Sequence, residues 1–550
     1  MISFLRKWPF VQYPCARPQP NVEALGPRLP LVNAAELGGL ERGVMHSLSK
    51  ASLLSAFALV CGAHSYAQSN KTHVAEARSV TAIPAERPPD PPAQLLFGAL
   101  PLSTHSVEAR TLLEKALENY ENAELDACLA DARKAAEKDP QFALAYGLWS
   151  YAARRDEPAA DALAKATALV LNAPPEEQLL VRWMIATQSS DLLPAISLMN
   201  DMLKNFPGNK HVLYLTAEWL YFQQDYDRSK KLFEKALQAD PKFPPPLNML
   251  GYAYIETGDP DPVKARAALQ RYAELLPDQP NPHDSLGEVL RNSGDDAASV
   301  EEYRKALAIT PNFYTSQQGI GESLTLAAKY DEARPELDKA IAMAPSVREK
   351  LHIELQKVLI RFWEGQPDKG REELRALENQ ARQENDAYAQ YDIGLSSAFL
   401  AANTDDELTQ LSRLESIFSN PFGAMAEGDR RTALASILRE EVRVLCKIGK
   451  VASAEDEIHE LEELSNTTRN TIIEDCYESA RGYVLFATGD YANAADELAT
   501  DPQNPLVARQ IVLAYEKLGN KAAAEVSRRR WQFLRDDTPQ WFVASSAAAN

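Results

Sequence analysis

Side chains that could carry out chemistry are spread along this 550-residue chain without any of the common catalytic spacings. The sequence has no GxxxxGK[ST] phosphate-binding loop, no HExxH zinc-peptidase helix and no GxSxG nucleophile turn. The segment "GIGES" (Gly319–Ser323) resembles the start of a dinucleotide-binding turn. No strand is expected before it, so we interpret its glycines as packing residues within a helix. The sequence therefore predicts a protein that is not an enzyme.

Histidines and cysteines, which most often serve nucleophilic and metal chemistry, are few and scattered. Four of the eight histidines lie at or before His105, and the other four are His211, His283, His352 and His459. The five cysteines form no CxxC pair and no spacing typical of a metal site. The 78 Asp and Glu residues offer many accidental pairs on helices, which carry no information about acid–base chemistry. We predict no metal and no cofactor.

Three cysteines, Cys128, Cys446 and Cys476, lie beyond the first hundred residues. Cys446 and Cys476 could form one disulfide in an oxidising compartment. Two separately buried thiols are the interpretation that we favour, because free cysteine commonly packs as a small apolar residue.

The charge balance is strongly acidic, with 58 Lys and Arg against 78 Asp and Glu and a formal net charge of −20. Binding to nucleic-acid phosphates requires a basic surface. The composition therefore argues against a nucleic-acid partner.

The elements that position these side chains follow from a near-regular series of prolines. Successive members are 34, 33, 34, 36, 34 and 34 residues apart. A fixed period near 34 indicates one two-helix unit repeated along the chain, because each unit buries its apolar face only against its neighbours. The prolines are Pro140, Pro174, Pro207, Pro241, Pro277, Pro311 and Pro345.

The residues between these prolines share a pattern of small and bulky positions. With each proline at position 32, small residues recur at positions 8, 20 and 27, and bulky ones at position 24. The clearest examples are Gly287, Gly321, Ser229, Ser299, Ala333, Ala236, Ala306, Ala340, Phe233, Tyr303 and Leu337. This pattern resembles the tetratricopeptide repeat, most specifically from Gln141 to Pro345. The resemblance implies an all-α fold, a right-handed superhelical solenoid of antiparallel helix pairs.

Helix pairs are also expected beyond the last of these prolines. They turn at a Gly-Gln-Pro segment and at Gly449, Gly489 and Gly519. We expect eleven or twelve helix pairs in all. The segment Phe418–Arg431 is the best candidate for a break between two stacks.

The first hundred residues differ from the rest. Lys50, an apolar run from Ala51 to Ala63 and Ser65-Tyr66-Ala67 before Gln68 have the layout of a secretory signal peptide. The run is too short to span a bilayer comfortably. Because the layout starts at Met45, we interpret residues 1–44 as an over-extended gene start. The rival interpretations are an internal signal anchor and a chance apolar helix.

The predicted organisation has six parts. They are an irregular segment at 1–44, a signal peptide at 45–67, a Pro-rich linker at 68–105, a repeat solenoid at 106–420, C-terminal helix pairs at 421–536 and a tail at 537–550. Export to the bacterial periplasm or cell envelope follows if the signal is real, and a cytoplasmic location if it is not.

The family resemblance also implies a partner-binding groove, because the first helix of each repeat lines the concave face. Inward positions 2, 5, 9 and 12 are His211, Tyr214, Glu218, Tyr221, Asn248, Tyr252, Asp284, Glu288, Arg291, Gln318 and Glu322. Our hypothesis is that tyrosines anchor an extended or helical peptide and that the acidic groups select a basic one. The alternative is an ordinary solvated helix face. The Lys and Asn clamp by which some family members hold chaperone tails is not reproduced.

The sequence thus predicts a non-catalytic scaffold that binds a protein or peptide. It predicts no nucleic-acid partner and no membrane span in the mature chain, and it leaves the oligomeric state open. Two alternatives remain: a regulatory or sensor arm of a larger system, and an enzyme with an unrecognised site in the groove.

Overall fold

Helices make up most of the chain that the structure describes. The structure is a computed structural model that describes residues 95–96, 100–153, 159–188, 193–257, 260–423, 425, 427–468 and 470–546. The segment at 1–44, the predicted signal peptide at 45–67 and most of the Pro-rich linker lie outside the described residues. The described residues all belong to one unit.

The described helices form twelve consecutive pairs and one further helix, within the expected range. The first six pairs are α2 (Val107–Glu121) with α3 (Leu125–Lys138), α4 (Ala143–Ala152) with α5 (Ala159–Leu169), α6 (Pro175–Ala186) with α7 (Leu193–Asn205), α8 (Lys210–Phe222) with α9 (Tyr226–Ala239), α10 (Pro245–Glu256) with α11 (Pro262–Leu275), and α12 (Asn281–Asn292) with α13 (Asp296–Ile309).

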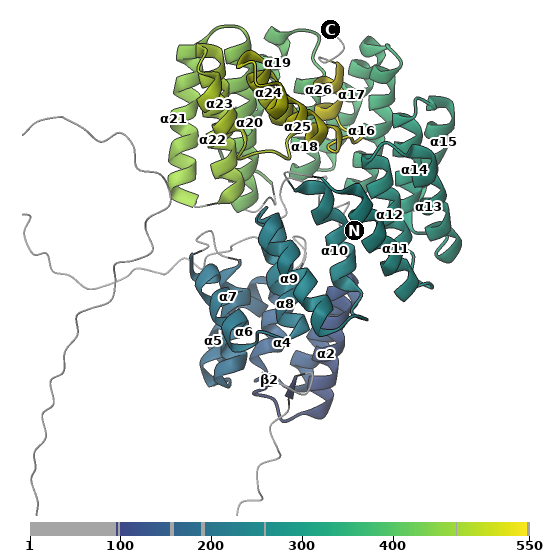
Figure 1. The fold of residues 1–550 in the computed structure, drawn as a ribbon, viewed down its shortest axis with the longest axis vertical. Helices are drawn as coiled ribbons and strands as arrows, with labels where there is room; N and C mark the ends of the chain where they lie inside the picture. Colours follow the sequence, from purple (N-terminus) through teal and green to yellow (C-terminus); the bar gives the residue numbers. More distant parts are fainter. Residues whose placement is uncertain are drawn as a thin grey trace, which may run out of the picture. The chain divides into compact units, whose positions relative to one another are not determined.

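The later pairs continue without a change of architecture (Figure 1). They are α14 (Tyr314–Leu326) with α15 (Tyr330–Met343), α16 (Val347–Trp363) with α17 (Pro367–Gln383), α18 (Ala387–Phe399) with α19 (Thr404–Phe418), α20 (Glu427–Lys447) with α21 (Val451–Thr468), α22 (Thr471–Thr488) with α23 (Tyr491–Leu498), and α24 (Pro505–Lys517) with α25 (Lys521–Gln532), followed by α26 (Pro539–Ser546). The prediction of an all-α solenoid of antiparallel helix pairs is confirmed. Below, the first helix of each pair is called its A helix and the second its B helix.

The seven prolines lie where the repeat pattern requires them. Each falls between the end of one B helix and the body of the next A helix, where a missing N–H and a fixed φ end one helix without breaking the next. A short 3-10 helix, η1 (Val170–Asn172), precedes the second of them, Pro174. The 34-residue period of the sequence is therefore the period of the structure.

Small residues at position 8 let the two helices of a repeat approach closely. A Cβ atom added to Gly287 would lie 2.9 Å from the ring of Tyr303, and one added to Gly321 would lie 2.5 Å from Leu337. Both bulky partners are at position 24, on the B helix. The bulky residue of one helix thus fills the space that the missing side chain of the other leaves.

Turns between A and B helices combine a left-handed residue with a side-chain cap. Gly294 and Gly489 have φ values of 82° and 89°, a region that glycine adopts without steric cost. The next B helix then begins with an aspartate that accepts a backbone N–H. Asp295 accepts from Ala298 and Asp490 accepts from Asn493.

The end of the predicted linker is tied to the repeats. Within the described residues the one sheet has two antiparallel strands, β1 (Leu95–Leu96) and β2 (Leu100–Pro101). The carboxylate of Glu177 on α6 accepts hydrogen bonds from the backbone and hydroxyl of Ser103 and from the Leu144 N–H. This buried carboxylate joins the segment before α2 to the second and third helix pairs.

The segment predicted as a break and the predicted tail both take part in the packing. The loop at 419–426 joins α19 to α20, and these two helices pack against each other. Phe418 and Ile437, on its two sides, belong to one apolar cluster. Trp541 and Ala544 of α26, inside the predicted tail, belong to the same cluster.

Among the described helices, none is both long enough and apolar enough to cross a membrane.

Candidate functional site

The eleven predicted groove residues lie on four A helices, α8, α10, α12 and α14, as the repeat pattern requires. Every one of them is buried, with at most 9% of its surface exposed. The structure therefore places them inside the molecule, where side chains of neighbouring repeats contact them. Their role in binding a partner stays a prediction.

On α8, three of these residues contact the first helix pair. The Tyr120 and Tyr214 hydroxyls donate to the two carboxylate oxygens of Glu218 at 2.7 and 3.0 Å. His211 Nδ1 lies 2.7 Å from the Glu121 carboxylate. Burial raises the pKa of Glu218 to about 7, against the opposing effect of the two tyrosine hydrogen bonds. This group fixes α2 onto α8.

On the next two A helices, Tyr252 and Asp284 are hydrogen-bonded to the following repeat. The Tyr252 hydroxyl donates to Glu288 at 2.9 Å, and the Ser316 hydroxyl donates to Asp284 at 2.6 Å. Burial raises the pKa of Asp284, and the Ser316 hydrogen bond opposes this rise. These bonds join α10 to α12 and α12 to α14.

Arg291 and Glu322 form the centre of the buried polar face. The Arg291 guanidinium pairs with the Glu322 carboxylate and donates to the Tyr303 hydroxyl at 3.0 Å. Glu322 also accepts from Gln318 at 2.9 Å and from Gln356 on α16. An ion pair at such a site is favourable only where further hydrogen bonds offset the loss of water. Glu322 accepts from two amides besides Arg291, whereas Arg291 Nε has no hydrogen-bond partner among the described residues. The polar ladder is the name used below for this row of A-helix side chains from Tyr252 to Gln356.

Tyr221 and Asn248 are two predicted groove residues outside the polar ladder. The Tyr221 ring packs edge-on against Phe222 and Tyr226, each with ring centroids 5.4 Å away. The buried side-chain oxygen of Asn248 has no hydrogen-bond partner among the described residues. The structure brings the other nine into contact with polar groups of neighbouring helices or of the chain's C-terminal segment.

The segment 533–546, called the C-terminal arm below, covers the ends of several A helices. The Arg535 guanidinium holds the Asp296 carboxylate with two hydrogen bonds of 2.6 and 2.7 Å. It also donates to the backbone carbonyls of Arg291 at 2.9 Å and Leu326 at 3.0 Å. Both carbonyls lie in the last turns of α12 and α14, where the helix dipole favours a cation.

Further contacts tie the arm to the polar ladder and to later repeats. Asp536 lies 3.1 Å from Arg291, and the Trp363 indole N–H donates to Asp537 at 3.3 Å. The Phe542 ring of α26 packs edge-on against Trp363, with ring centroids 4.7 Å apart. The sequence analysis did not predict the contacts of the arm. The arm belongs to no repeat, so the repeat pattern assigns no position to its residues.

The three cysteines within the described residues offer no reactive thiol. Cys128, Cys446 and Cys476 are free, so the interpretation of separate thiols is confirmed for the last two, with Cys446 only half-buried. Burial raises the pKa of each to about 12, which keeps the thiols protonated and unreactive at neutral pH.

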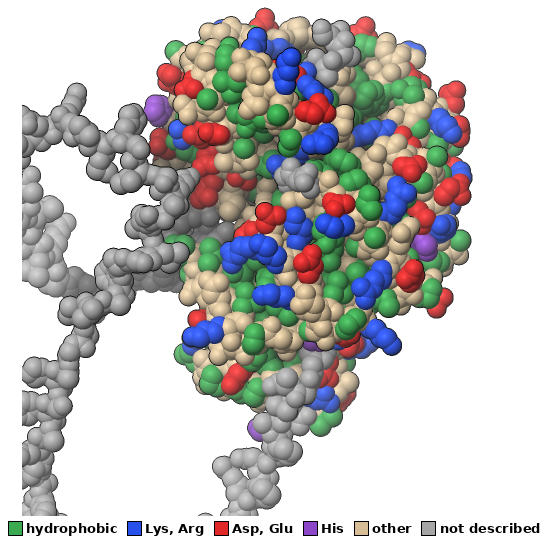
Figure 2. Space-filling view, viewed as in Figure 1, with side chains coloured by type: hydrophobic (Ala, Val, Ile, Leu, Met, Phe, Trp, Pro, Cys, Tyr) green, Lys and Arg blue, Asp and Glu red, His purple; other side chains and the backbone are tan. Residues whose placement is uncertain are grey.

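On the visible surface, acidic and basic side chains are interspersed, with apolar side chains scattered among them (Figure 2). No area of one sign dominates the face in view. The charge distribution on this face therefore does not suggest a class of ligand. The hydrogen bonds of the C-terminal arm are more specific.

Comparisons with known proteins agree with this architecture. Two family models described as tetratricopeptide repeat match residues 220–289 and 283–313. The comparison with curated proteins gave no match.

Among solved structures, MamA is 24% identical over 27% of this chain and 86% of its own, with a TM-score of 0.25. A tetratricopeptide repeat protein from Parabacteroides merdae is 12% identical over 50% of this chain and 93% of its own, with a TM-score of 0.30. YrrB, described as having an unusual peptide-binding site, is 19% identical over 40% and 96%, with a TM-score of 0.25. At such low scores we draw no conclusion from these alignments. The matched family models thus identify tetratricopeptide repeats within residues 220–313, and the neighbouring helix pairs continue the same spacing of prolines.

Proposed function

We propose that the chain is a non-catalytic protein-binding scaffold that takes a basic peptide segment in the place that its own C-terminal arm occupies. The tetratricopeptide repeats indicate a protein-interaction scaffold, and proteins built from them are generally non-catalytic. The observation that carries the finer proposal is the set of contacts around Arg535.

The Arg535 contacts are suited to one kind of side chain. A carboxylate and two helix-end carbonyls supply only acceptors, so they favour a cation. The paired hydrogen bonds to Asp296 fit the planar fork of arginine better than the single ammonium of lysine. A partner segment with an arginine followed by an aromatic residue could reproduce the contacts of Arg535 and Phe542.

In this proposal the arm and the partner compete. Residues of the polar ladder contact the arm through Asp536 and Arg291, so displacing the arm would uncover that end of the ladder. The predicted groove then binds a partner only after the arm has left. Arm and partner cannot occupy the site together, so the arm lowers the apparent affinity for the partner.

A synthetic peptide of residues 530–546 serves as the probe, because it carries the arm's own contacts. Its binding to the full chain is measured by fluorescence anisotropy for the wild type, for Arg535→Ala and for the control Arg528→Ala. Arg528 lies on α25 and pairs with Glu516 at 2.7 Å and Glu525 at 2.5 Å, away from the arm contacts.

We expect Arg535→Ala to bind the probe at least about tenfold more tightly than the wild type and the control do, since charged hydrogen bonds contribute about 1.5–3 kcal/mol. A probe that itself carries Arg535→Ala should bind at least about tenfold more weakly. Equal affinity for all three chains, or for both probes, would contradict the proposal.

We also propose export to the bacterial periplasm or cell envelope. This rests on the signal layout at 45–67, outside the described residues. N-terminal sequencing of the protein from the envelope fraction should start at or near Gln68. A chain that keeps Met1 in the cytoplasm would contradict export.

A further inference from the structure

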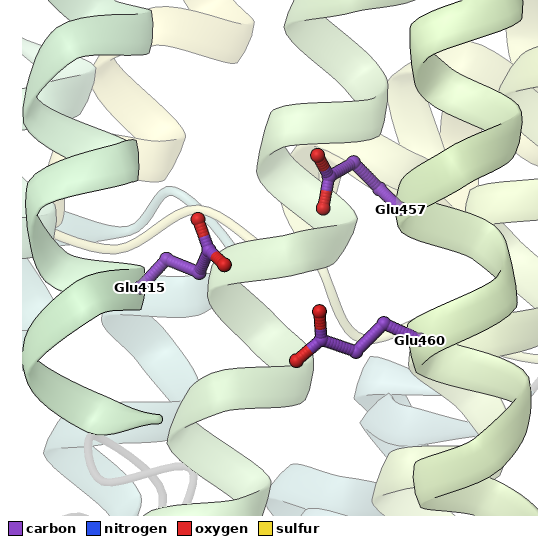
Figure 3. Close-up of side chains that lie close together, drawn as sticks. All are labelled: Glu415, Glu457 and Glu460. Carbon is purple, nitrogen blue, oxygen red and sulfur yellow. The ribbon is translucent and has the colours of Figure 1, made fainter. Parts of the chain in front are cut away.

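Three carboxylates from two helices converge beside α20. One carboxylate oxygen from each of Glu415, Glu457 and Glu460 lies within 4.8 Å of the others. Figure 3 shows Glu415 of α19 pointing toward the two α21 side chains, whose carboxylates point back toward it. Glu457 and Glu460 are three residues apart and so project from the same face of their helix.

A fourth carboxylate comes from α20, the helix that packs against both α19 and α21. Glu441 is 2% exposed, and one of its oxygens accepts from the Ser412 hydroxyl at 2.7 Å. Its other oxygen, Oε2, is buried and has no hydrogen-bond partner among the described residues. A buried acceptor without a donor is costly, so this atom indicates a missing positive group.

Glu441 is close enough to the other three for their charges to act on it. Burial, opposed by the Ser412 hydrogen bond, raises the pKa of Glu441 to about 8, and the charges of Glu457, Glu415 and Glu460 add to this rise. Burial also raises the pKa of Glu457 to about 7, with contributions from Glu415, Glu460 and Asp456. Each group thus responds to the negative charge of its neighbours.

The surrounding chain supplies no compensating cation. Helix α21 contains six acidic residues and neither lysine nor arginine. Arg413, two residues from Glu415, pairs instead with Glu378 at 3.6 Å. His459, beside Glu460, points to Glu462 at 3.9 Å. Within the described residues the four carboxylates therefore repel one another without a protein counter-charge.

We propose that Glu415, Glu457 and Glu460 bind a hard divalent cation of the size of Ca²⁺, with Glu441 as a fourth carboxylate on the buried side. Carboxylate oxygens alone, without thiolate or imidazole, suit Ca²⁺, Mg²⁺ or Mn²⁺ rather than Zn²⁺. Oxygens on opposite sides of Ca²⁺ are about 4.6–5.2 Å apart, and those around Mg²⁺ only about 4.2 Å. The three cluster oxygens lie within 4.8 Å of one another, close enough to share one such ion. We favour Ca²⁺ because it accepts irregular oxygen sites, whereas Mg²⁺ demands near-ideal octahedral geometry.

Such an ion would join three consecutive helices. It would link α19 to α21 across α20, in the part of the chain beyond the last of the seven prolines. Binding would then stabilise this part of the solenoid by RT ln(1 + [ion]/Kd), which grows with the logarithm of the ion concentration, because the unfolded chain has no such arrangement of oxygens.

The test uses the full chain, treated with a chelator and titrated with CaCl2, MgCl2 or ZnCl2, by calorimetry and by thermal unfolding. The test variant is Glu457→Gln with Glu460→Gln. The matched control is Glu455→Gln with Glu463→Gln, which removes the same charge from exposed positions of the same helix. Because the test variant relieves repulsion, it is expected to fold, and Glu441→Gln provides a second, single-residue variant.

We expect Ca²⁺ to raise the melting temperature of the wild type and the control by several degrees and to leave the test variant unchanged. Calcium affinity should fall at least tenfold in the test variant and in Glu441→Gln, and Mg²⁺ should bind more weakly than Ca²⁺. No Ca²⁺ response in the wild type at millimolar concentration, an equal response in the test variant, or a response to Zn²⁺ alone would overturn the proposal.

Discussion

Two sets of carboxylates in this molecule differ in the groups that face them. On the polar ladder, Glu288 accepts from a tyrosine and Glu322 pairs with Arg291. Between α19 and α21, Glu441 and Glu457 face further carboxylates and have no cationic partner among the described residues. Burial of an acidic residue therefore has two meanings here.

The contrast separates architecture from ligand binding. Where the chain supplies the donors, a buried carboxylate joins one repeat to the next and is already satisfied. Where the chain supplies only like charges, the arrangement is favourable only with a proton or a cation from outside. The predictions below change one side of this contrast at a time.

The largest loss of stability is expected from a substitution in the polar ladder, where the carboxylates have donors. Glu322→Ala leaves Arg291 charged and buried, with its main partner removed. Breaking one partner of a buried pair costs about 3–5 kcal/mol. Urea unfolding should show this loss, and hydrogen exchange should speed up in α12 and α14.

The control for this variant is Glu301→Ala, which removes an exposed partner of Arg304 and should change stability by less than about 1 kcal/mol. If both variants were equally stable, the polar ladder would contribute nothing to the packing of the repeats.

The next effect is local opening of the arm. Arg535→Ala removes two hydrogen bonds to Asp296 and two to helix-end carbonyls. The amide hydrogen exchange of α26 should become at least about tenfold faster, while that of α2 to α9 stays unchanged. Unchanged exchange in α26 would show that its aromatic contacts alone hold the arm in place.

The stability contributed by the carboxylate cluster between α19 and α21 is expected to depend on pH. In the chelated protein, the raised pKa values of Glu441 and Glu457 mean that the folded chain keeps protons that the unfolded chain loses above a pKa of about 4.5. Stability from this cluster is therefore lost as the pH rises from about 5 to about 8.

Comparison with the double variant Glu441→Gln, Glu457→Gln isolates this dependence from other titrating groups. The groups that face it are Glu415, Glu460 and Asp456. The difference in melting temperature between variant and wild type should grow from pH 5 to pH 8. A constant difference would mean that the pKa values of Glu441 and Glu457 are not raised in the folded chain.

The smallest effect is expected for one charge alone. Without calcium, Glu457→Gln should raise the melting temperature by about 1–2 °C, because it removes like-charge repulsion. Glu455→Gln, at an exposed position of the same helix, should change it less. Destabilisation by Glu457→Gln at neutral pH would indicate a cation partner that the cluster already has within the chain.

The fold was accessible from the sequence because its rules are local. The proline spacing marks the joints between repeats, and Gly287 and Gly321 pair with bulky residues of their own repeat. Positions within the repeat also predicted which helices carry the inner residues. All of this depends on spacing within about one repeat length.

The environment of those residues depends on contacts that spacing does not encode. The direction of Arg291 from its helix follows from its position, but its partners are Glu322 of the next repeat and Asp536 of the arm. The partners of Arg535 are more than 200 residues away. The burial of the predicted groove residues could not be predicted from the pattern within a single repeat, because the residues that cover them belong to other repeats and to the arm.

Only part of the carboxylate cluster could be predicted from the sequence. Glu457 and Glu460 have the spacing of neighbours on a helix, but so do many acidic pairs in this chain. Their approach to Glu415 and Glu441 requires three helices from the part where the proline marker is lost. The absence of basic residues from α21 is the one signal that could have drawn attention to it.

The contrast between the two sets of carboxylates is tested most directly by hydrogen exchange of the full chain with and without calcium, resolved along the sequence. Added Ca²⁺ should slow exchange in α19, α20 and α21 and leave α8 to α14 unchanged. Slower exchange in α12 and α14, or no change anywhere, would contradict the account.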